Sequence, residues 1–186
     1  MSGPAAGPAA GPDGRATTAL VVGNPKPASR TLVAGRHVVT GLTDAEPDLV
    51  VDLGLLGARL LDRGDGEVTA LVDAVAGADL VVVASPTYKA TYTGLLKVFL
   101  DRFAAGAIRG VSAPVMLAGS PHHALAAELT LRPVLSEIAS GPVLKGLCVL
   151  EAEHDDPRAY ADWLGTARPT TDRLLAPTPA PTGAPA

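Results

Sequence analysis

One stretch of the chain, residues 78–103 with the sequence ADLVVVASPTYKATYTGLLKVFLDRF, constrains the fold more than any other. Its apolar run from Leu80 to Val83 is rich in β-branched side chains and too short for a buried helix, which predicts a strand covered on both faces. Pro86 ends this strand, because proline has no N–H for the sheet ladder. A helix is expected after the loop, from apolar residues at helical spacing: Leu96, Phe99, Leu100 and Phe103. The stretch therefore predicts a central parallel strand whose loop lies at the carboxyl edge, where open α/β sheets bind ligands.

Apolar strands and amphipathic helices alternate along the rest of the chain. Strands are expected at 18–22, 48–53, 80–83, 113–119 and 143–151. Besides the helix after the central strand, helices are expected around 32–42, 68–77, 123–139 and 156–175. This alternation is typical of an α/β fold with a doubly wound, five-stranded parallel sheet. Right-handed crossovers favour the strand order 2-1-3-4-5.

Length and composition predict one folded domain of residues 17–175. The chain has 186 residues, and its two ends, residues 1–16 and 176–186, are rich in Pro, Gly and Ala, so a disordered leader and a disordered tail are expected. A net charge of -4 and a pI near 5.5 give no basic surface for nucleic acid. No apolar run approaches the roughly 20 residues that span a bilayer, so we expect a soluble, cytoplasmic protein without membrane contact.

A loop of small and polar residues, GNPKPASRT at 23–31, follows the first strand. Ser29 is placed to cap the next helix, and the free N–H groups and dipole of a helix start favour an anion. The loop matches neither GxxxxGK[ST] nor GxGxxG, so nucleoside triphosphate and Rossmann dinucleotide sites lose their main support. The loop is a candidate phosphate site, and turns of this kind also start helices without binding anything.

Three loops at strand ends converge in the predicted strand order. The loop after the central strand holds Tyr88 and Tyr92, two of the three tyrosines in the chain, and offers a planar ring backbone groups and aromatic side chains. The third loop, Gly119-Ser120-Pro121-His122-His123, is placed to cover the outer edge of that ring. A phosphate loop next to a ring-binding loop predicts a flavin mononucleotide (FMN) site.

Three motifs resemble the NADPH-dependent FMN reductase family: GNPKPASRT at 23–31, SPTYKATYTGLLKVFLD at 85–101 and HALAAELTLRPVL at 123–135. Within the family, the chain is most similar to the flavin reductases of two-component alkanesulfonate monooxygenases, over residues 19–153. The resemblance implies a flavodoxin-like fold and reduction of FMN by NADPH or NADH. It also implies a homodimer or tetramer, and supply of reduced flavin to a partner monooxygenase.

The resemblance assigns roles to individual residues. Phosphate contacts are implied for Asn24, Lys26, Ser29 and Thr31. The isoalloxazine ring would lie against Pro86, Thr87, Tyr88 and Lys89. Gly119 and Ser120 would close the site, and His123 matches a histidine that relatives often have. No side chain is assigned as catalytic, because a flavin that takes hydride at N5 needs only position and hydrogen bonds from the protein.

Two residues depart from the family pattern. Asn24 stands where a serine or threonine is usual, a mild change because an amide can also donate to phosphate. Leu129 stands where related reductases have a tyrosine or histidine in a π-helical bulge associated with flavin release. Pro133 lacks the N–H that the carbonyl of Leu129 would accept from, so a kink or bulge is still expected there. From the missing polar side chain we expect this chain to hold FMN more firmly than those relatives.

Other interpretations of the same residues remain open. Tyr88 and Tyr92 could be packing residues, and Cys148, the single cysteine, reads as a small buried hydrophobe. The adjacent His122 and His123 are badly spaced for a metal, and no GxSxG motif supports a hydrolase. The rival functions are an FMN-containing quinone or azo reductase and a non-enzymatic carrier of flavodoxin type. The modest net charge argues against the carrier.

Overall fold

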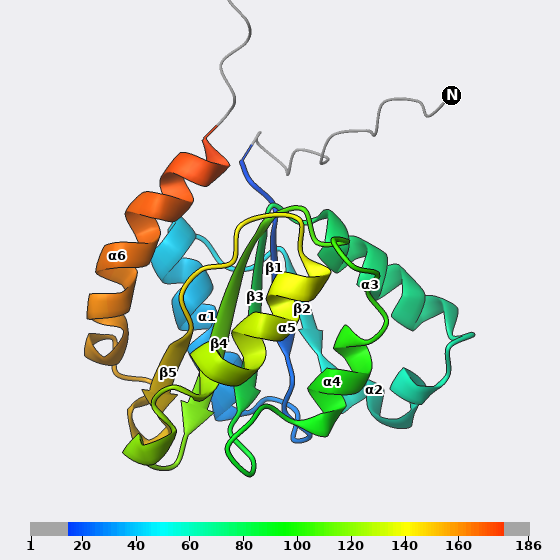
Figure 1. Cartoon of the computed structure of the whole chain (residues 1–186), viewed down its shortest axis with the longest axis horizontal. Helices are drawn as coiled ribbons and strands as arrows, with labels where there is room; N and C mark the ends of the chain where they lie inside the picture. Colours follow the sequence, from blue (N-terminus) through cyan, green and yellow to red (C-terminus); the bar gives the residue numbers. More distant parts are fainter. Residues whose placement is uncertain (1–14, 177–186) are drawn as a thin grey trace, which may run out of the picture.

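The structure, a computed structural model, describes residues 15–176 and contains one five-stranded parallel sheet (Figure 1). Its strands run in the order β2-β1-β3-β4-β5, which confirms the predicted flavodoxin-like order. The strands are β1 (Thr18–Val22), β2 (Leu49–Asp52), β3 (Leu80–Pro86), β4 (Val111–Ala118) and β5 (Leu147–Leu150). Most of the expected leader and tail lies outside the described residues.

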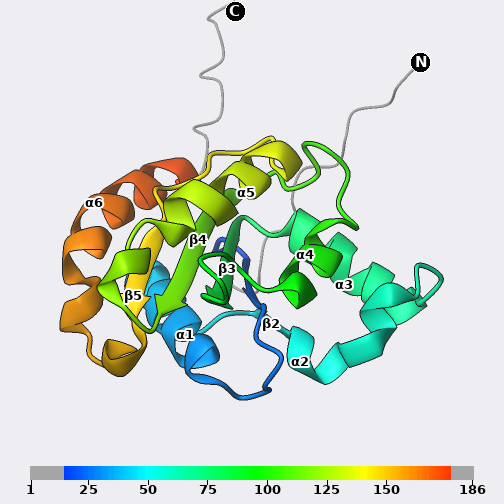
Figure 2. The ribbon, with the colours of Figure 1, turned by 60° about the horizontal axis from the view of Figure 1, so that its bottom comes forward.

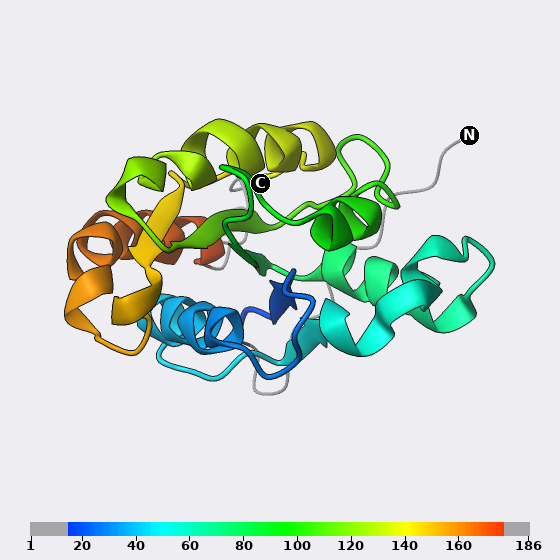
Figure 3. The same ribbon diagram turned by 90° about the horizontal axis from the view of Figure 1, so that it is seen from below.

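Helices cover both faces of the sheet, as the view along the strands shows (Figure 3). One face carries α1 (Arg30–Thr43) and α6 (Arg158–Leu175). The opposite face carries α3 (Gly66–Gly77), α4 (Gly94–Leu100) and α5 (Arg132–Ile138). Short helical segments complete the chain: α2 (Leu53–Leu56), η2 (Gly57–Leu61), η3 (Pro121–His123), η4 (Ala127–Leu131) and η5 (Glu151–Glu153). Among residues 15–176, no helix is both long and apolar enough to cross a membrane.

The sheet separates two apolar cores, because successive strand residues point to opposite faces. In β1, Ala19 and Val21 pack with α3, α4 and α5, whereas Leu20 and Val22 pack with α1 and α6. All residues of β1 and of β4 are buried. Burial on both faces is the reason that these strands read as unbroken apolar runs rather than as alternating patterns.

The helix predicted at 123–139 is divided into three segments. η3 is followed by η4, a π-helix, which runs directly into α5. The predicted bulge is therefore present, immediately before Pro133. The hydroxyl of Thr130 donates to the carbonyl of Ala126 at 2.6 Å, which satisfies one acceptor of the widened turn. Glu128 contributes further, because its carboxylate accepts from Arg132 at 3.2 Å and from the backbone N–H of Gly146 at 2.6 Å.

Four of the five strands have bounds that differ from the predicted ones. β3 continues to Pro86, and β4 spans Val111–Ala118 rather than 113–119. The strand expected at 143–151 is shorter, because only Leu147–Leu150 pairs with β4, and Val143 makes an isolated bridge to Ser112. The strand expected at 48–53 ends one residue early. Its last residue, Asp52, caps α2 by accepting from the N–H of Gly54 at 3.2 Å, so the chain turns into a helix at that point.

Candidate functional site

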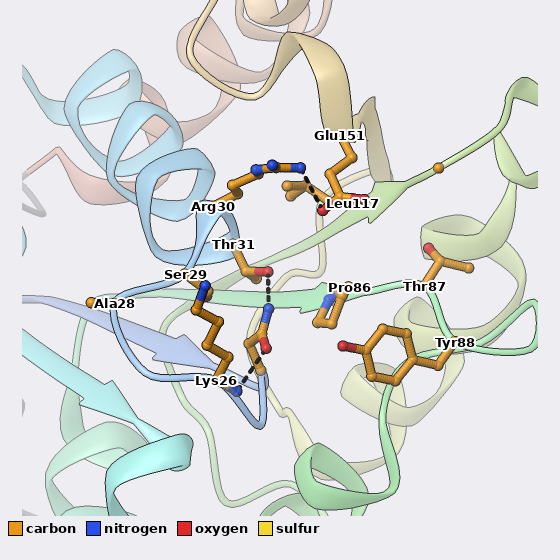
Figure 4. Close-up of a pocket in the computed structure, with 12 residues that line it drawn as sticks. Lys26, Ala28, Ser29, Arg30, Thr31, Pro86, Thr87, Tyr88, Leu117 and Glu151 are labelled. Carbon is orange, nitrogen blue, oxygen red and sulfur yellow. Dashed lines mark hydrogen bonds and ion pairs between the residues drawn. The ribbon is translucent and has the colours of Figure 1, made fainter.

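A cleft of about 340 Å³ opens at the carboxyl edge of the sheet. The loops after β1, β3 and β4 come together at this edge (Figure 2). The cleft brings together eight of the predicted site residues: Asn24, Lys26, Ser29, Thr31, Pro86, Thr87, Tyr88 and Gly119. Ala28, Arg30, Leu117 and Glu151 complete the lining (Figure 4). The three remaining predicted residues, Lys89, Ser120 and His123, are not among those that line it.

Side chains rather than regular structure fix the loop after β1. The amide oxygen of Asn24 accepts from the N–H of Lys26, and its NH₂ group donates to Oγ1 of Thr31, both at 2.9 Å. Asp52 of the neighbouring strand accepts from the N–H of Ala28 at 3.0 Å, which holds that residue at a left-handed φ of 49°. Asn24 therefore orders the loop and leaves the hydroxyl proton of Thr31 free to donate.

Gly54 lies under this loop at close range. A Cβ atom there would be 2.9 Å from the carbonyl oxygen of Asn24 and 3.0 Å from that of Pro25. Real side chains do not tolerate contacts this short with backbone, so the loop depends on a glycine at this position. The loop after β1 is thus supported from below by the start of α2.

Two buried hydroxyl groups in the cleft have no hydrogen-bond partner among the described residues, Oγ of Ser29 and Oγ1 of Thr87. Ser29 is only 6% exposed and is the N-cap residue of α1, yet its side chain accepts no capping bond. A buried hydroxyl without a partner is destabilising and calls for an explanation. Because the first N–H groups of a helix also lack partners, the start of α1 is a cradle for an anion.

The loop after β3 is tied to the loop after β1 by Thr93. Its hydroxyl donates to the carbonyl of Gly23 at 2.6 Å and accepts from the N–H of Leu96 at 3.1 Å, so that it also caps α4. The N–H of Thr93 donates to Oγ of Ser85 at 3.2 Å. These bonds hold the two loops at a fixed separation, as a site for a rigid ligand requires.

The tip of the loop after β3 is a tight turn. Tyr88 and Thr91 exchange backbone hydrogen bonds of 2.8 and 3.3 Å, and both residues between them, Lys89 (φ 53°) and Ala90 (φ 68°), lie in the left-handed region. Figure 4 shows the Tyr88 side chain extending from this turn with its hydroxyl directed toward the cleft. Its exposure of 52% argues against the packing interpretation, whereas Tyr92 packs against the core.

The loop after β4 contributes the backbone of Gly119 to the cleft. Beyond it, Oγ of Ser120 accepts from the N–H of His122 at 3.3 Å and caps η3. The carbonyl of His123 accepts from the thiol of Cys148 at 3.3 Å. Burial raises the pKa of that thiol, in agreement with a structural rather than a reactive cysteine. Within residues 15–176, no three His, Cys, Asp or Glu side chains are grouped to hold a metal ion.

Sequence reasoning missed one feature of the cleft, an ion pair between Arg30 and Glu151. The Nη1 and Oε1 atoms lie 3.0 Å apart, although the residues are 121 positions apart in the chain. Arg30 directly follows Ser29, a predicted site residue, and this neighbourhood in the sequence could have indicated that Arg30 lines the cleft. Nothing local marks Glu151, since it reaches the cleft only through the position of β5 in the sheet.

The fold defines a flavodoxin-like protein, and its cleft is lined by the start of α1 and by the loops after β1, β3 and β4. Comparison with known proteins agrees with this class. The sequence model of the NADPH-dependent FMN reductase family matches residues 17–155, and the chain belongs to this family.

Two curated relatives cover most of the chain. An FMN reductase (NADPH) of Pseudomonas aeruginosa is 32% identical over 146 residues, 72% of this chain and 76% of the relative. The NADH-dependent FMN reductase SfnF of Pseudomonas fluorescens is 32% identical over 156 residues, 78% of this chain and 79% of the relative. Among solved structures, the NADH:FMN oxidoreductase EMOB in its apo form has a TM-score of 0.75 at 28% identity, and the match covers 88% of this chain and 92% of that one.

Proposed function

We propose that this protein is an NAD(P)H-dependent FMN reductase and that the cleft binds FMN with its phosphate at the start of α1. The observation that carries the proposal is the pair of buried, unpartnered hydroxyls, Ser29 and Thr87, in one cleft at a helix N-terminus. Membership of the FMN reductase family supports the activity. One relative is named for NADPH and another for NADH, so the proposal covers both nucleotides.

At the phosphate end, Ser29 and Thr31 donate their hydroxyl protons and the first N–H groups of α1 supply further donors. Lys26 adds a positive charge on an exposed side chain. Asn24 orders the loop and has one N–H left beyond the bond to Thr31. Because Ser29 and Thr31 donate to the phosphate and Asn24 orders the loop, an amide side chain can stand at position 24, where relatives have a hydroxyl.

At the ring end, Pro86, Thr87 and Tyr88 form the surface against which the isoalloxazine lies, with Gly119 at its far side. Lys89, Ser120 and His123 lie on the same loops outside the cleft lining, and we assign them to the ring end from the family resemblance. When bound, FMN supplies the redox chemistry by accepting hydride from the nicotinamide. The chain binds and orients the two ring systems, and the proposal names no catalytic acid or base.

A homodimer or tetramer is the second part of the proposal. Leu125 and Leu129, before and within the π-helix η4, are 61% and 67% exposed, and burial of such side chains against a second copy would stabilise an assembly. Sedimentation at micromolar concentration should show a dimer or larger species, and a monomer would contradict this part. Transfer of reduced flavin to a partner monooxygenase is proposed from the resemblance alone.

The test is NAD(P)H oxidation under anaerobic conditions, with and without added FMN. Added FMN should be reduced in step with nicotinamide oxidation, and free flavin rescues activity if the protein is isolated without it. A flavodoxin-type carrier would leave NADPH and NADH unoxidised, which would contradict the proposal. A quinone reductase would turn over many equivalents only after a quinone is added. NAD(P)H oxidation measured with added FMN and with an added quinone therefore separates the proposed function from both rival functions.

A further inference from the structure

The Arg30–Glu151 pair lies on one wall of the cleft (Figure 4). Arg30 is the first residue of α1 and directly follows Ser29, whose unpartnered hydroxyl marks the phosphate end. Glu151 is the first residue of η5, at the end of β5. Both residues line the same cleft as Lys26, and these three are the charged residues of its lining among residues 15–176.

This ion pair is weak and can be exchanged. The two side chains are 61% and 51% exposed, and ion pairs in such surroundings contribute little to stability. A phosphate monoester offers the planar guanidinium two oxygens and a charge near -2, which makes it a stronger partner than one carboxylate oxygen. The carboxylate of Glu151 also repels a phosphate that enters the cleft.

We propose that Glu151 is an affinity-setting residue, which holds Arg30 in an ion pair and competes with the FMN phosphate for its guanidinium. The inference rests on the proposed function and deepens it. FMN binding then includes a change of partner by Arg30, from Glu151 to phosphate. The cost of that exchange falls on phosphate-bearing flavin alone, so it lowers the affinity for FMN without weakening contacts to the ring. It thus favours release of flavin, opposite in direction to the effect expected from Leu129.

The experiment measures the dissociation constants of FMN and riboflavin by fluorescence titration for the wild type, Glu151→Gln, Arg30→Gln and the double variant. Glu153→Gln is the matched control, because it removes the same charge from an exposed position of the same turn, outside the cleft lining. Glu151→Gln should bind FMN about three- to tenfold more tightly, with riboflavin unchanged. Arg30→Gln should weaken FMN about tenfold. In the double variant the gain from Glu151→Gln should be smaller than in the wild-type background, because only the repulsion of the phosphate by Glu151 is then removed.

Equal effects of Glu151→Gln and Glu153→Gln on FMN would overturn the inference, since the change would then be one of net charge. Equal effects on FMN and riboflavin would overturn it as well, because the phosphate would not be involved. An altered KM for NADPH but not for NADH, with FMN affinity unchanged, would place the competing phosphate on the nicotinamide nucleotide and contradict the assignment. A wild type that binds neither flavin would instead overturn the proposed function, and the inference with it.

Discussion

Ser29 and Thr93 both stand at helix N-caps beside the cleft, but the fold uses only one of the two hydroxyls. Thr93 caps α4 and donates to Gly23, whereas the buried hydroxyl of Ser29 has no hydrogen-bond partner within the part of the chain that the structure describes. If the Ser29 hydroxyl is kept for a ligand, its removal should cost the flavin-free protein nothing and should damage flavin binding. Ser29→Ala should therefore affect flavin binding and spare stability, whereas Thr93→Ala should lower stability.

The expected effects on the flavin-free protein follow from the hydrogen bonds. A buried, unpaired hydroxyl costs about 1–3 kcal/mol, so Ser29→Ala should leave the free energy of unfolding unchanged or raise it by up to about 1 kcal/mol once the small void is included. Thr93→Ala loses two hydrogen bonds, one of which is the cap of α4, about 2 kcal/mol in total. For a domain of this size, 1 kcal/mol corresponds to a Tm shift of about 2–4 °C.

Ser29→Ala should impair FMN binding, although it should not destabilise the flavin-free protein. A hydrogen bond to a charged group contributes about 1.5–3 kcal/mol, so Ser29→Ala should weaken FMN binding roughly ten- to a hundredfold. Riboflavin lacks the phosphate and should bind the variant as it binds the wild type. Adding Thr31→Ala should weaken FMN further and still spare riboflavin.

Scanning calorimetry of flavin-free protein and fluorescence titration with both flavins are the assays. A Ser29→Ala variant that unfolds as early as Thr93→Ala would refute the argument, because the serine hydroxyl would then stabilise the fold. Equal loss of FMN and riboflavin would refute the phosphate assignment.

Three further predictions concern the bulge, the loop support and the pH response. Wild type purified without added flavin should retain FMN, and Leu129→Tyr should lower the FMN content several-fold, because a polar contact at an interface contributes about 1 kcal/mol. A colourless wild type whose FMN content does not change on Leu129→Tyr would contradict the prediction that this chain holds FMN firmly. Gly54→Ala should weaken FMN binding and lower the Tm through overpacking of about 1–3 kcal/mol against the carbonyl of Asn24, and wild-type values for both would show that the loop adapts. Although burial alone would raise the pKa of Asp48, hydrogen bonds from Thr18 and the charge of Arg15 lower it below 3.8. The stability that Asp48 contributes is complete above about pH 5 and is lost as the pH falls through the lowered pKa, so unfolding of Asp48→Asn should depend less on pH between about 5 and 3.

The sequence specifies the sheet because its strands are buried on both faces. An apolar run such as Leu80–Val83 is rich in β-branched residues and too short for a buried helix, so it forms a buried strand. Right-handed crossovers then favour the observed order of the strands. The bulge at η4 was predictable for a similar reason, since a proline removes a backbone donor whatever surrounds it. These features depend on local chemistry.

The parts that could not be predicted depend on contacts between distant segments. The strand at 143–151 is shortened because only four of its residues lie beside β4, which its apolar pattern cannot show. The bond from Ala28 to Asp52 and the ion pair of Arg30 with Glu151 join segments that meet only when the sheet is assembled. The family motifs placed eight residues in the cleft, and these long-range partners explain how the loops that carry them are held.

A crystal structure of the protein with FMN bound would show directly whether the cleft is the flavin site. The phosphate should lie at the start of α1, within hydrogen-bond distance of Oγ of Ser29, and the isoalloxazine should lie against Pro86, Thr87 and Tyr88. The hydroxyl of Thr87 should then have a hydrogen-bond partner. A phosphate bound elsewhere, with the hydroxyls of Ser29 and Thr87 still unpaired, would show that the cleft does not bind flavin in the proposed way.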